Sequence, residues 1–179
     1  MNVGQMRKAF EGLVEDSVDT ALFVQWLNEA QEDVATSYSS ISSAVITIDD
    51  CSQEYELPED ALKVQEIVSS TGHTYTDYIV TERGTIRFAT AGTYTMYYFR
   101  MPQPLEAGDD TAEPDLPALL HTPLYIYAAS MYYDKISGAD EADSAMATKL
   151  LRRYEHMVAR RVAKLKARKR EFPSFTAGR

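Results

Sequence analysis

The order of the predicted elements indicates an α+β protein that is helical at both ends and β in the middle. Apolar residues recur at helical spacing near each end, whereas the middle holds short β-branched and aromatic runs separated by turn residues. We expect a helical bundle made from the N- and C-terminal helices, with an inserted antiparallel β module and a long C-terminal helix that ends in an extended tail. The 179 residues, 45% of them hydrophobic, suffice for one domain with a core.

The start of the chain predicts two helices within residues 3–38. Met6 and Phe10 belong to a first apolar run with helical period. The segment 16–19, Asp-Ser-Val-Asp, then offers N-cap residues for a second helix. The apolar positions of this second helix, between residues 22 and 34, lie on one face, and most of its polar residues lie on the other.

Residues 44–101 predict the β module. Its last strand carries aromatic residues on both faces, which indicates a central or interfacial strand. Turn residues such as Arg83-Gly84 separate the runs. The predicted strands are Val45–Ile48, Glu54–Leu57, Lys63–Val68, Tyr75–Thr81, Thr85–Phe88 and Thr93–Met101.

A linker rich in proline and acidic residues, 102–117, ends the β module. Pro117 fits the first turn of a new helix, which Pro123 either restarts or kinks. The run 124–136 is apolar nearly all round, so we expect this helix to be buried on several sides. Gly138 is a natural C-cap for it.

A long helix over residues 140–170 completes the chain, and its apolar stripe ends at Leu165. The prediction is therefore a single domain over 1–165, with helices at 3–38 and 117–165, followed by a basic tail over 166–179. The stripe consists of Met146, Leu150, Tyr154, Val158, Val162 and Leu165.

The charge is distributed very unevenly along the chain. Residues 149–179 hold eleven Lys and Arg against two Asp and Glu, whereas residues 1–148 hold seven against 25. Basic residues at a helix end complement its dipole, but this number exceeds what the dipole needs. Two further interpretations stay open: binding to nucleic-acid phosphates, and docking into an acidic groove of a protein partner.

The last residues of the sequence favour docking to a protein. Two phenylalanines flank Pro173-Ser174, which is typical of a short segment that becomes ordered on a partner, and phosphate contact does not require them. The predicted docking residues are Arg168, Lys169, Arg170, Phe172, Phe175 and Arg179.

Twelve tyrosines form a second unusual feature, since they concentrate at 94–98 and 125–133. A tyrosine packs its ring while leaving a hydroxyl for a partner, so these clusters predict either a subunit interface or a half-polar core between sheet and helix. The aromatic residues concerned are Tyr97, Phe99, Tyr125, Tyr132 and Tyr133.

Motifs for catalysis, cofactors and metals are missing from the sequence. The three histidines lie far apart, the glycines form no phosphate-binding loop, and no serine lies in a nucleophile elbow. Cys51 follows two aspartates, which disfavour a thiolate. The acid pairs Asp49/Asp50 and Asp109/Asp110 lie in predicted turns, where Asp is common. We therefore expect no enzyme, no cofactor and no metal, although a small divalent-metal enzyme that uses these acids is a third alternative.

No apolar run has the roughly 18 residues that span a bilayer, and the first ten residues lack the apolar segment of a signal peptide. We expect no membrane partner. A lone cysteine, Cys51, fits a reducing compartment such as a cytoplasm.

Four segments in a fixed order give the sequence a family resemblance. They are Trp26-Leu27-Asn28-Glu29-Ala30-Gln31; Tyr55–Asp60 followed by the strand 63–68; Gly84–Phe88 and Ala91–Tyr94 leading into an aromatic strand that ends at Pro102; and the aromatic helix followed by a long helix and a basic tail. In this order they resemble the head-to-tail adaptor, or connector, proteins of tailed double-stranded DNA bacteriophages.

The resemblance implies a structural virion protein at the neck of the particle, assembled in the host cytoplasm. Such adaptors form a homo-oligomeric ring, commonly of twelve subunits, that binds the portal protein and continues the DNA channel. They offer a platform for tail assembly, so tail or neck proteins are further partners. By this resemblance residues 168–179 contact the portal.

The acidic body of the chain agrees with such a channel, because it repels phosphates and lets double-stranded DNA pass without sequence-specific contact. Glu106, Asp109 and Asp110 are candidate acids of the channel lumen. The alternative function is a nucleic-acid-binding module that uses the basic C-terminal helix.

Overall fold

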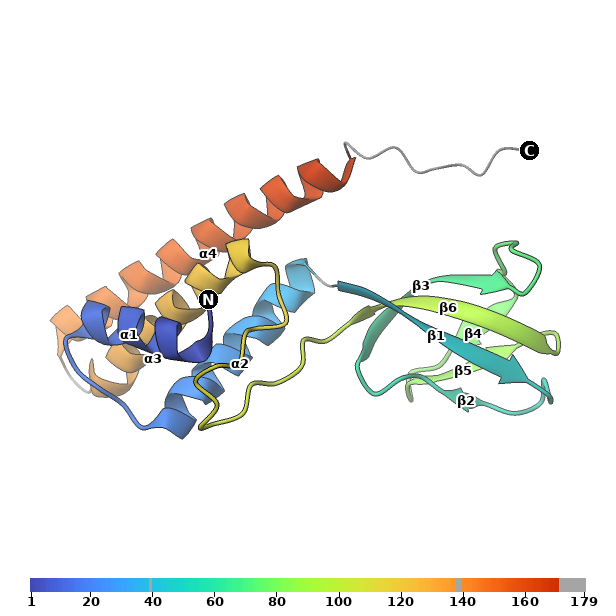
Figure 1. The fold of residues 1–179 in the computed structure, drawn as a ribbon, viewed down its shortest axis with the longest axis horizontal. Coiled ribbons are helices and arrows are strands. Elements are labelled where there is room, and N and C mark those ends of the chain that lie inside the picture. The colour runs from blue at the N-terminus through green and yellow to red at the C-terminus, as the bar shows by residue number, and fades with distance from the viewer. Residues whose placement is uncertain (39, 138–139, 171–179) are drawn as a thin grey trace. The chain divides into compact units, whose positions relative to one another are not determined.

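The computed structural model describes residues 1–38, 40–137 and 140–170, and confirms the α+β class (Figure 1). The chain divides into two compact units, one built from residues 1–38 and 103–179 and the other from residues 39–102. The helical elements are α1 (Val3–Val14), α2 (Thr20–Ser37), the short 3₁₀ helix η1 (Ala118–Leu120), α3 (His121–Ser137) and α4 (Glu141–Arg170). The strands are β1 (Ser40–Ile48), β2 (Tyr55–Glu56), β3 (Ala61–Ser69), β4 (Tyr78–Val80), β5 (Thr85–Phe88) and β6 (Gly92–Arg100).

In the helical unit α3 is the element that the other helices contact. It packs against α1, α2 and α4, which explains why its sequence is apolar nearly all round. Phe10 of α1 lies at the centre of an aromatic group, with its ring 5.1 Å from Phe23 and 5.9 Å from Tyr132. Trp26 of α2 is buried next to the same ring, as the apolar face of this helix predicts.

The first two helices begin at caps that hold them in place. Asn2 and Gln5 form a capping box at the start of α1, in which each side chain bonds the backbone nitrogen of the other residue. Asp19, one of the predicted N-cap residues, accepts from the backbone nitrogens of Ala21 and Leu22. The two N-caps therefore supply acceptors for backbone N–H groups that the start of a helix leaves without partners.

The long C-terminal helix is confirmed, but one residue of its predicted stripe is wrong. Met146 is 37% exposed, and Ala147 is buried in its place. The cause is geometric, because each step of four residues turns about 40° beyond a full turn of the helix. The residues from Leu150 to Val162 already span the buried face, and one further step back, to Met146, leaves it. The helix continues past Leu165 to Arg170.

The β unit consists of two three-stranded antiparallel sheets, in the orders β1-β6-β3 and β2-β5-β4. The aromatic strand β6 is the central strand of its sheet, as predicted. Gly84, between β4 and β5, has a φ of 75°, a left-handed value that suits glycine in this turn. The core of the unit consists of Ile48, Ile67, Ile86, Phe88, Tyr94, Met96 and Tyr98.

Two strand starts differ from the prediction by more than two residues. The first strand begins at Ser40, and not at Val45, because β1 pairs with β6 over its whole length, from Ser40 opposite Arg100 onward. This pairing overrides the weak strand preference of the serines. The strand predicted from Tyr75 is reduced to β4, since Tyr75 packs its ring 4.6 Å from that of Tyr94.

The helix after the linker also begins later than predicted. Pro117 precedes the 3₁₀ turn η1, and α3 starts at His121, so Pro123 occupies its first turn without kinking it. The predicted cap Gly138 lies outside the described residues.

Candidate interaction surfaces

The side chains of α2 position the acidic linker, residues 103–117. Asn28 forms two hydrogen bonds with the backbone of Leu105: its Oδ1 accepts from the nitrogen at 2.8 Å, and its Nδ2 donates to the carbonyl at 3.0 Å. The buried side chain of Gln31 donates to Asn28 and accepts from the backbone nitrogen of Asp115. Two amides one helical turn apart therefore fasten both ends of the linker to α2.

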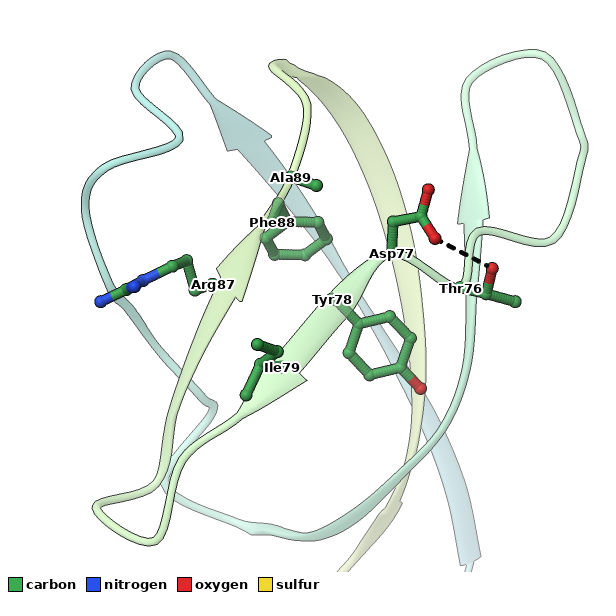
Figure 2. Close-up of a pocket in the computed structure, with 7 residues that line it drawn as sticks. All are labelled: Thr76, Asp77, Tyr78, Ile79, Arg87, Phe88 and Ala89. Atoms are coloured by element: carbon green, nitrogen blue, oxygen red, sulfur yellow. Dashed lines mark hydrogen bonds between the residues drawn. The ribbon is translucent and has the colours of Figure 1, made fainter.

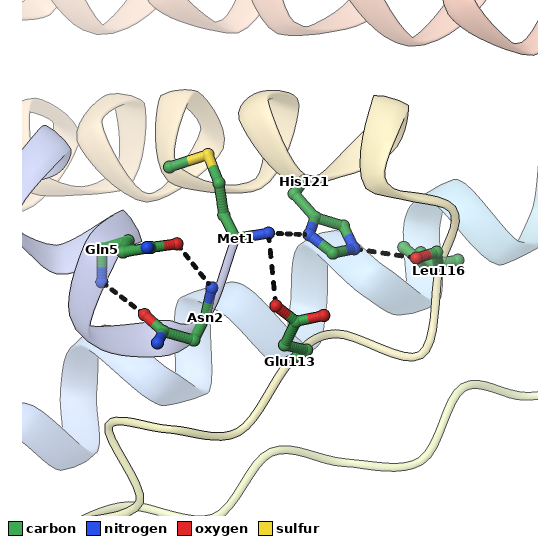
Figure 3. Close-up of polar contacts among 6 residues, drawn as sticks. All are labelled: Met1, Asn2, Gln5, Glu113, Leu116 and His121. Carbon is green, nitrogen blue, oxygen red and sulfur yellow. Dashed lines mark hydrogen bonds and ion pairs between the residues drawn. The ribbon is translucent and has the colours of Figure 1, made fainter.

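A second group of polar contacts joins the start of the chain to α3 (Figure 3). The amino group of Met1 lies 2.8 Å from Nδ1 of His121 and 3.7 Å from a carboxylate oxygen of Glu113. Nε2 of His121 lies 2.8 Å from the carbonyl oxygen of Leu116, which can only accept. Nε2 therefore carries the proton and Nδ1 accepts, which makes this buried histidine a packing residue.

The three candidate lumen acids are all exposed on the acidic linker. Asp109 accepts from the hydroxyl and backbone nitrogen of Thr111, and these bonds hold the pKa of its carboxyl below the ordinary value. The carbonyl of Asp110 accepts from the backbone nitrogen of Gly4, which ties the linker to α1. Glu106 is exposed in the same turn.

The five aromatic residues that the sequence predicts as interface or core occupy two different units. Tyr132 is buried in the helical core, and Tyr125 and Tyr133 pack partly buried against it. Phe99 and Tyr97 lie on the face of β6 opposite the buried Tyr98, and Tyr97 is 38% exposed. The buried tyrosines of each cluster pack in the core of their own unit, Tyr132 in the helical unit and Tyr94 and Tyr98 in the β unit.

Two phenol–carboxylate pairs, which the sequence pattern does not reveal, lie in the helical unit: one joins α3 to the loop between α1 and α2, and the other joins α4 to α2. Tyr132 donates to Asp16 at 2.5 Å, and this bond raises the pKa of Tyr132 to about 12 and lowers the pKa of Asp16. Tyr154 of α4 donates to Asp33 of α2 at 2.5 Å, and burial together with this bond raises the pKa of Tyr154. The hydroxyls of both tyrosines are thus used within the chain.

The exposed side of α4 carries a row of cations, which we call the basic face: Lys149, Arg152, Arg153, Arg160 and Lys164. Arg161, on the flank of this row, instead donates to the carbonyl of Leu119 at 2.7 Å. None of the five residues forms an ion pair with a carboxylate of the described part of the chain. The basic face is therefore available to an anionic surface.

Of the predicted docking residues, Arg168, Lys169 and Arg170 form the end of α4. Phe172, Phe175 and Arg179 lie outside the described residues. The assignment of these six residues to docking stays a prediction.

The β unit holds an open hollow of about 280 Å³ beside strands β4 and β5 (Figure 2). Its lining is mainly apolar, with Tyr78, Ile79 and Phe88 around it. Arg87 extends away from these rings in Figure 2 and pairs with Glu54 at 3.3 Å. The polar residues Thr76 and Asp77 complete one side of the hollow, which offers room for a side chain.

Residues 1–38, 40–137 and 140–170 contain neither a cluster of metal ligands nor a membrane-spanning helix. No three His, Cys, Asp or Glu side chains of this part gather as metal ligands. None of its helices combines the length and apolar character that a bilayer-spanning helix needs.

Comparison with known proteins identifies the family. No curated protein sequence matches the chain. The model of the family described as SU10 adaptor protein matches residues 1–176, which is nearly the whole chain. This protein therefore belongs to the SU10 adaptor protein family, a family of structural bacteriophage proteins, as the order of its sequence motifs predicts.

Proposed function

We propose that the protein forms a ring between the portal and the tail of a bacteriophage, continues the DNA channel and serves as a platform for tail assembly. Membership of an adaptor family supports this role, because an adaptor has to bind proteins on two sides.

The observation that carries the proposal is the construction of α4. This 30-residue helix, about 45 Å long, is anchored by Leu150, Tyr154, Val158 and Val162, all buried. Beyond Leu165 it continues to Arg170 with basic residues, and the sequence then supplies Phe172 and Phe175. A long helix with basic residues at its end, followed in the sequence by two phenylalanines, is suited to docking on an acidic, pocketed surface of the portal.

The acidic linker fits the proposed channel. It carries five carboxylates and no Lys or Arg, and Glu106, Asp109 and Asp110 are exposed on it. The hydrogen bonds from Thr111 lower the pKa of Asp109, which favours its charged form. Such a surface repels phosphates, so DNA would pass without being held along those of its acids that face the channel, and its other acids are left for contacts between subunits.

Co-sedimentation with the portal protein of the same phage tests this function. We expect the protein to sediment with portal rings in a fixed ratio, and to do so in the presence of excess double-stranded DNA. Absence of the protein from the portal fraction at every salt concentration would overturn the proposal.

The second candidate function, nucleic-acid binding, is favoured by the unpaired basic face of α4. It makes a different prediction, because affinity for DNA phosphates falls steeply with salt and does not depend on phenylalanines. Changing Phe172 and Phe175 to Ala should therefore weaken portal docking and leave DNA binding unchanged. If the double change leaves portal binding unaffected and added salt abolishes portal binding, the C-terminal segment binds through charge alone, as a protein binds nucleic-acid phosphates.

A further inference from the structure

The basic face of α4 is an unpartnered helix surface of considerable length. From Lys149 to Lys164 it extends about 22 Å along the helix axis. Arg153 and Arg160 lie seven residues apart, close to two full turns, so they point in nearly the same direction. All five cations of the face are exposed and unpaired with carboxylates of the described residues.

The row of cations on the basic face is far longer than the stability of the helix requires. Only a charge in the last turn interacts well with the helix dipole, and Lys149 lies near the start of α4. Like charges spaced three and four residues apart along a helix repel one another. The face is therefore mildly unfavourable in an isolated chain and becomes favourable against an anionic surface.

The same chain carries a complementary surface on other elements. The acidic linker contacts α1 through Gly4 and Asp110, and α2 through Asn28 and Leu105, whereas α4 packs on α3. Figure 1 shows the linker crossing α2 and passing the start of α1, while α4 lies above them in the view. Residues 101–134 contain no Lys or Arg, and the amino group of Met1 lies beside Glu113.

We propose that the basic face of α4 in one copy contacts the acidic linker of the next copy, head to tail. This inference rests on the proposed ring, to which it assigns an interface. Two different patches on each subunit make a heterologous contact, which is the kind of contact that closes into a ring. Charge complementarity also fixes which surfaces meet, because basic faces repel one another and so do linkers.

A second copy explains the basic face better than DNA does. Residues 1–148 carry 25 acidic against seven basic side chains, so most of the surface repels phosphates. A neighbouring copy offers an acidic surface that is fixed in shape, since Asp109 is held by Thr111 and Leu105 is held by Asn28. DNA binding to the face is one of the outcomes that the experiment distinguishes.

A charge-swap experiment tests the contact. Variant A carries Arg153→Glu and Arg160→Glu, and variant B carries Glu106→Lys and Asp110→Lys. Sedimentation velocity in low salt measures the concentration at which each associates. We expect A alone and B alone to need about tenfold more protein than the unchanged chain, because each opposes like charges across the contact. An equimolar mixture of A and B should recover association, since each linker then meets an α4 of opposite charge.

A control with the same change in net charge as variant A carries Lys63→Glu and Arg83→Glu, two exposed positions in the β unit. It should associate as the unchanged chain does, and circular dichroism should show all variants folded. Rising salt should weaken association of the unchanged chain.

Three results would overturn the contact: variants A and B that associate normally, a mixture that does not recover, or an unchanged chain that stays monomeric in low salt. A variant A that loses only binding to a double-stranded DNA probe would assign the face to nucleic acid instead. Portal co-sedimentation of the unchanged chain, run in parallel, shows separately whether the proposed function stands.

Discussion

Asn28 illustrates how one side chain determines the position of a surface far away in sequence. Its amide has one donor and one acceptor group that match the backbone of Leu105, so a segment without regular structure is held as if it were paired to a strand. Gln31 holds the other end of the linker at Asp115. These contacts give a physical reason for two polar residues within the motif Trp26–Gln31.

Replacing Asn28 with Ala should lower the free energy of unfolding by about 2 kcal/mol, because two backbone groups of Leu105 lose their partner. Denaturant unfolding measures this loss, and hydrogen exchange should show a faster amide at Leu105. Asn28→Asp is the matched control, because it keeps the acceptor and loses the donor. The backbone amide of Leu105 should therefore remain more protected from exchange in this variant than in the Ala variant. Equal exchange in all three proteins would contradict the role of Asn28.

The Tyr132–Asp16 pair predicts a defined pH dependence. This bond raises the pKa of Tyr132 to about 12. The contribution of Tyr132 to the free energy of unfolding is therefore complete below the ordinary tyrosine pKa of about 10 and is lost as the pH rises above it. The pKa of Asp16 is lowered, so its contribution is present above about pH 4 and is lost as pH falls below that. The stability difference between the unchanged chain and Tyr132→Phe should therefore be constant between these limits.

Outside those limits, in stronger acid and in stronger base, the difference should shrink. Urea unfolding at a series of pH values measures it for both proteins. A difference that does not change with pH would show that the hydroxyl of Tyr132 stabilises the fold without its bond to Asp16.

At the residue scale the sequence predicted burial better than it predicted hydrogen bonds. Trp26 and Phe10 were recognisable from the helical period, because burial follows from spacing. The partners of Asn28, Asp16 and Asp33 lie many positions away in the sequence, and only the folded arrangement brings them together.

At the scale of elements, prediction succeeded where local signals and packing agree. Strand β5 has the predicted bounds, and helix α1 forms over the first apolar run, since turn residues or caps enclose them. Strand β1 starts earlier than predicted because its partner β6, and not its own serines, sets its length. A single sequence cannot show such a partner, and the same limit explains why the division of the strands into two sheets was not anticipated.

Helix α4 and its basic end give a prediction of their own. Deleting residues 168–179 should leave the melting temperature nearly unchanged, because the buried anchors of α4 end before Leu165. The deletion should abolish binding to the portal, measured by co-sedimentation. Phe172→Ala with Phe175→Ala, which retains every charge, should weaken binding by at least about tenfold if the rings fill pockets. Unchanged portal binding by the truncated chain would end the docking hypothesis.

At the scale of the whole molecule the outstanding property is the separation of charge between the basic end and the acidic remainder of the chain. This separation was fully visible in the sequence, since it needs only counting. The structure adds where the charges lie: cations along the exposed side of α4 and carboxylates on a linker that α1 and α2 hold in place. Two complementary surfaces on each subunit can join one copy to the next. The C-terminal end of α4 is then left for a different partner.

Electron microscopy of portal rings mixed with the protein tests the central claim most directly. We predict a second ring, coaxial with the portal and open at its centre, whose subunits have the C-terminal end of α4 on the portal side. Portal rings that remain bare at saturating protein, with the protein found only as separate particles, would contradict the role proposed for this chain.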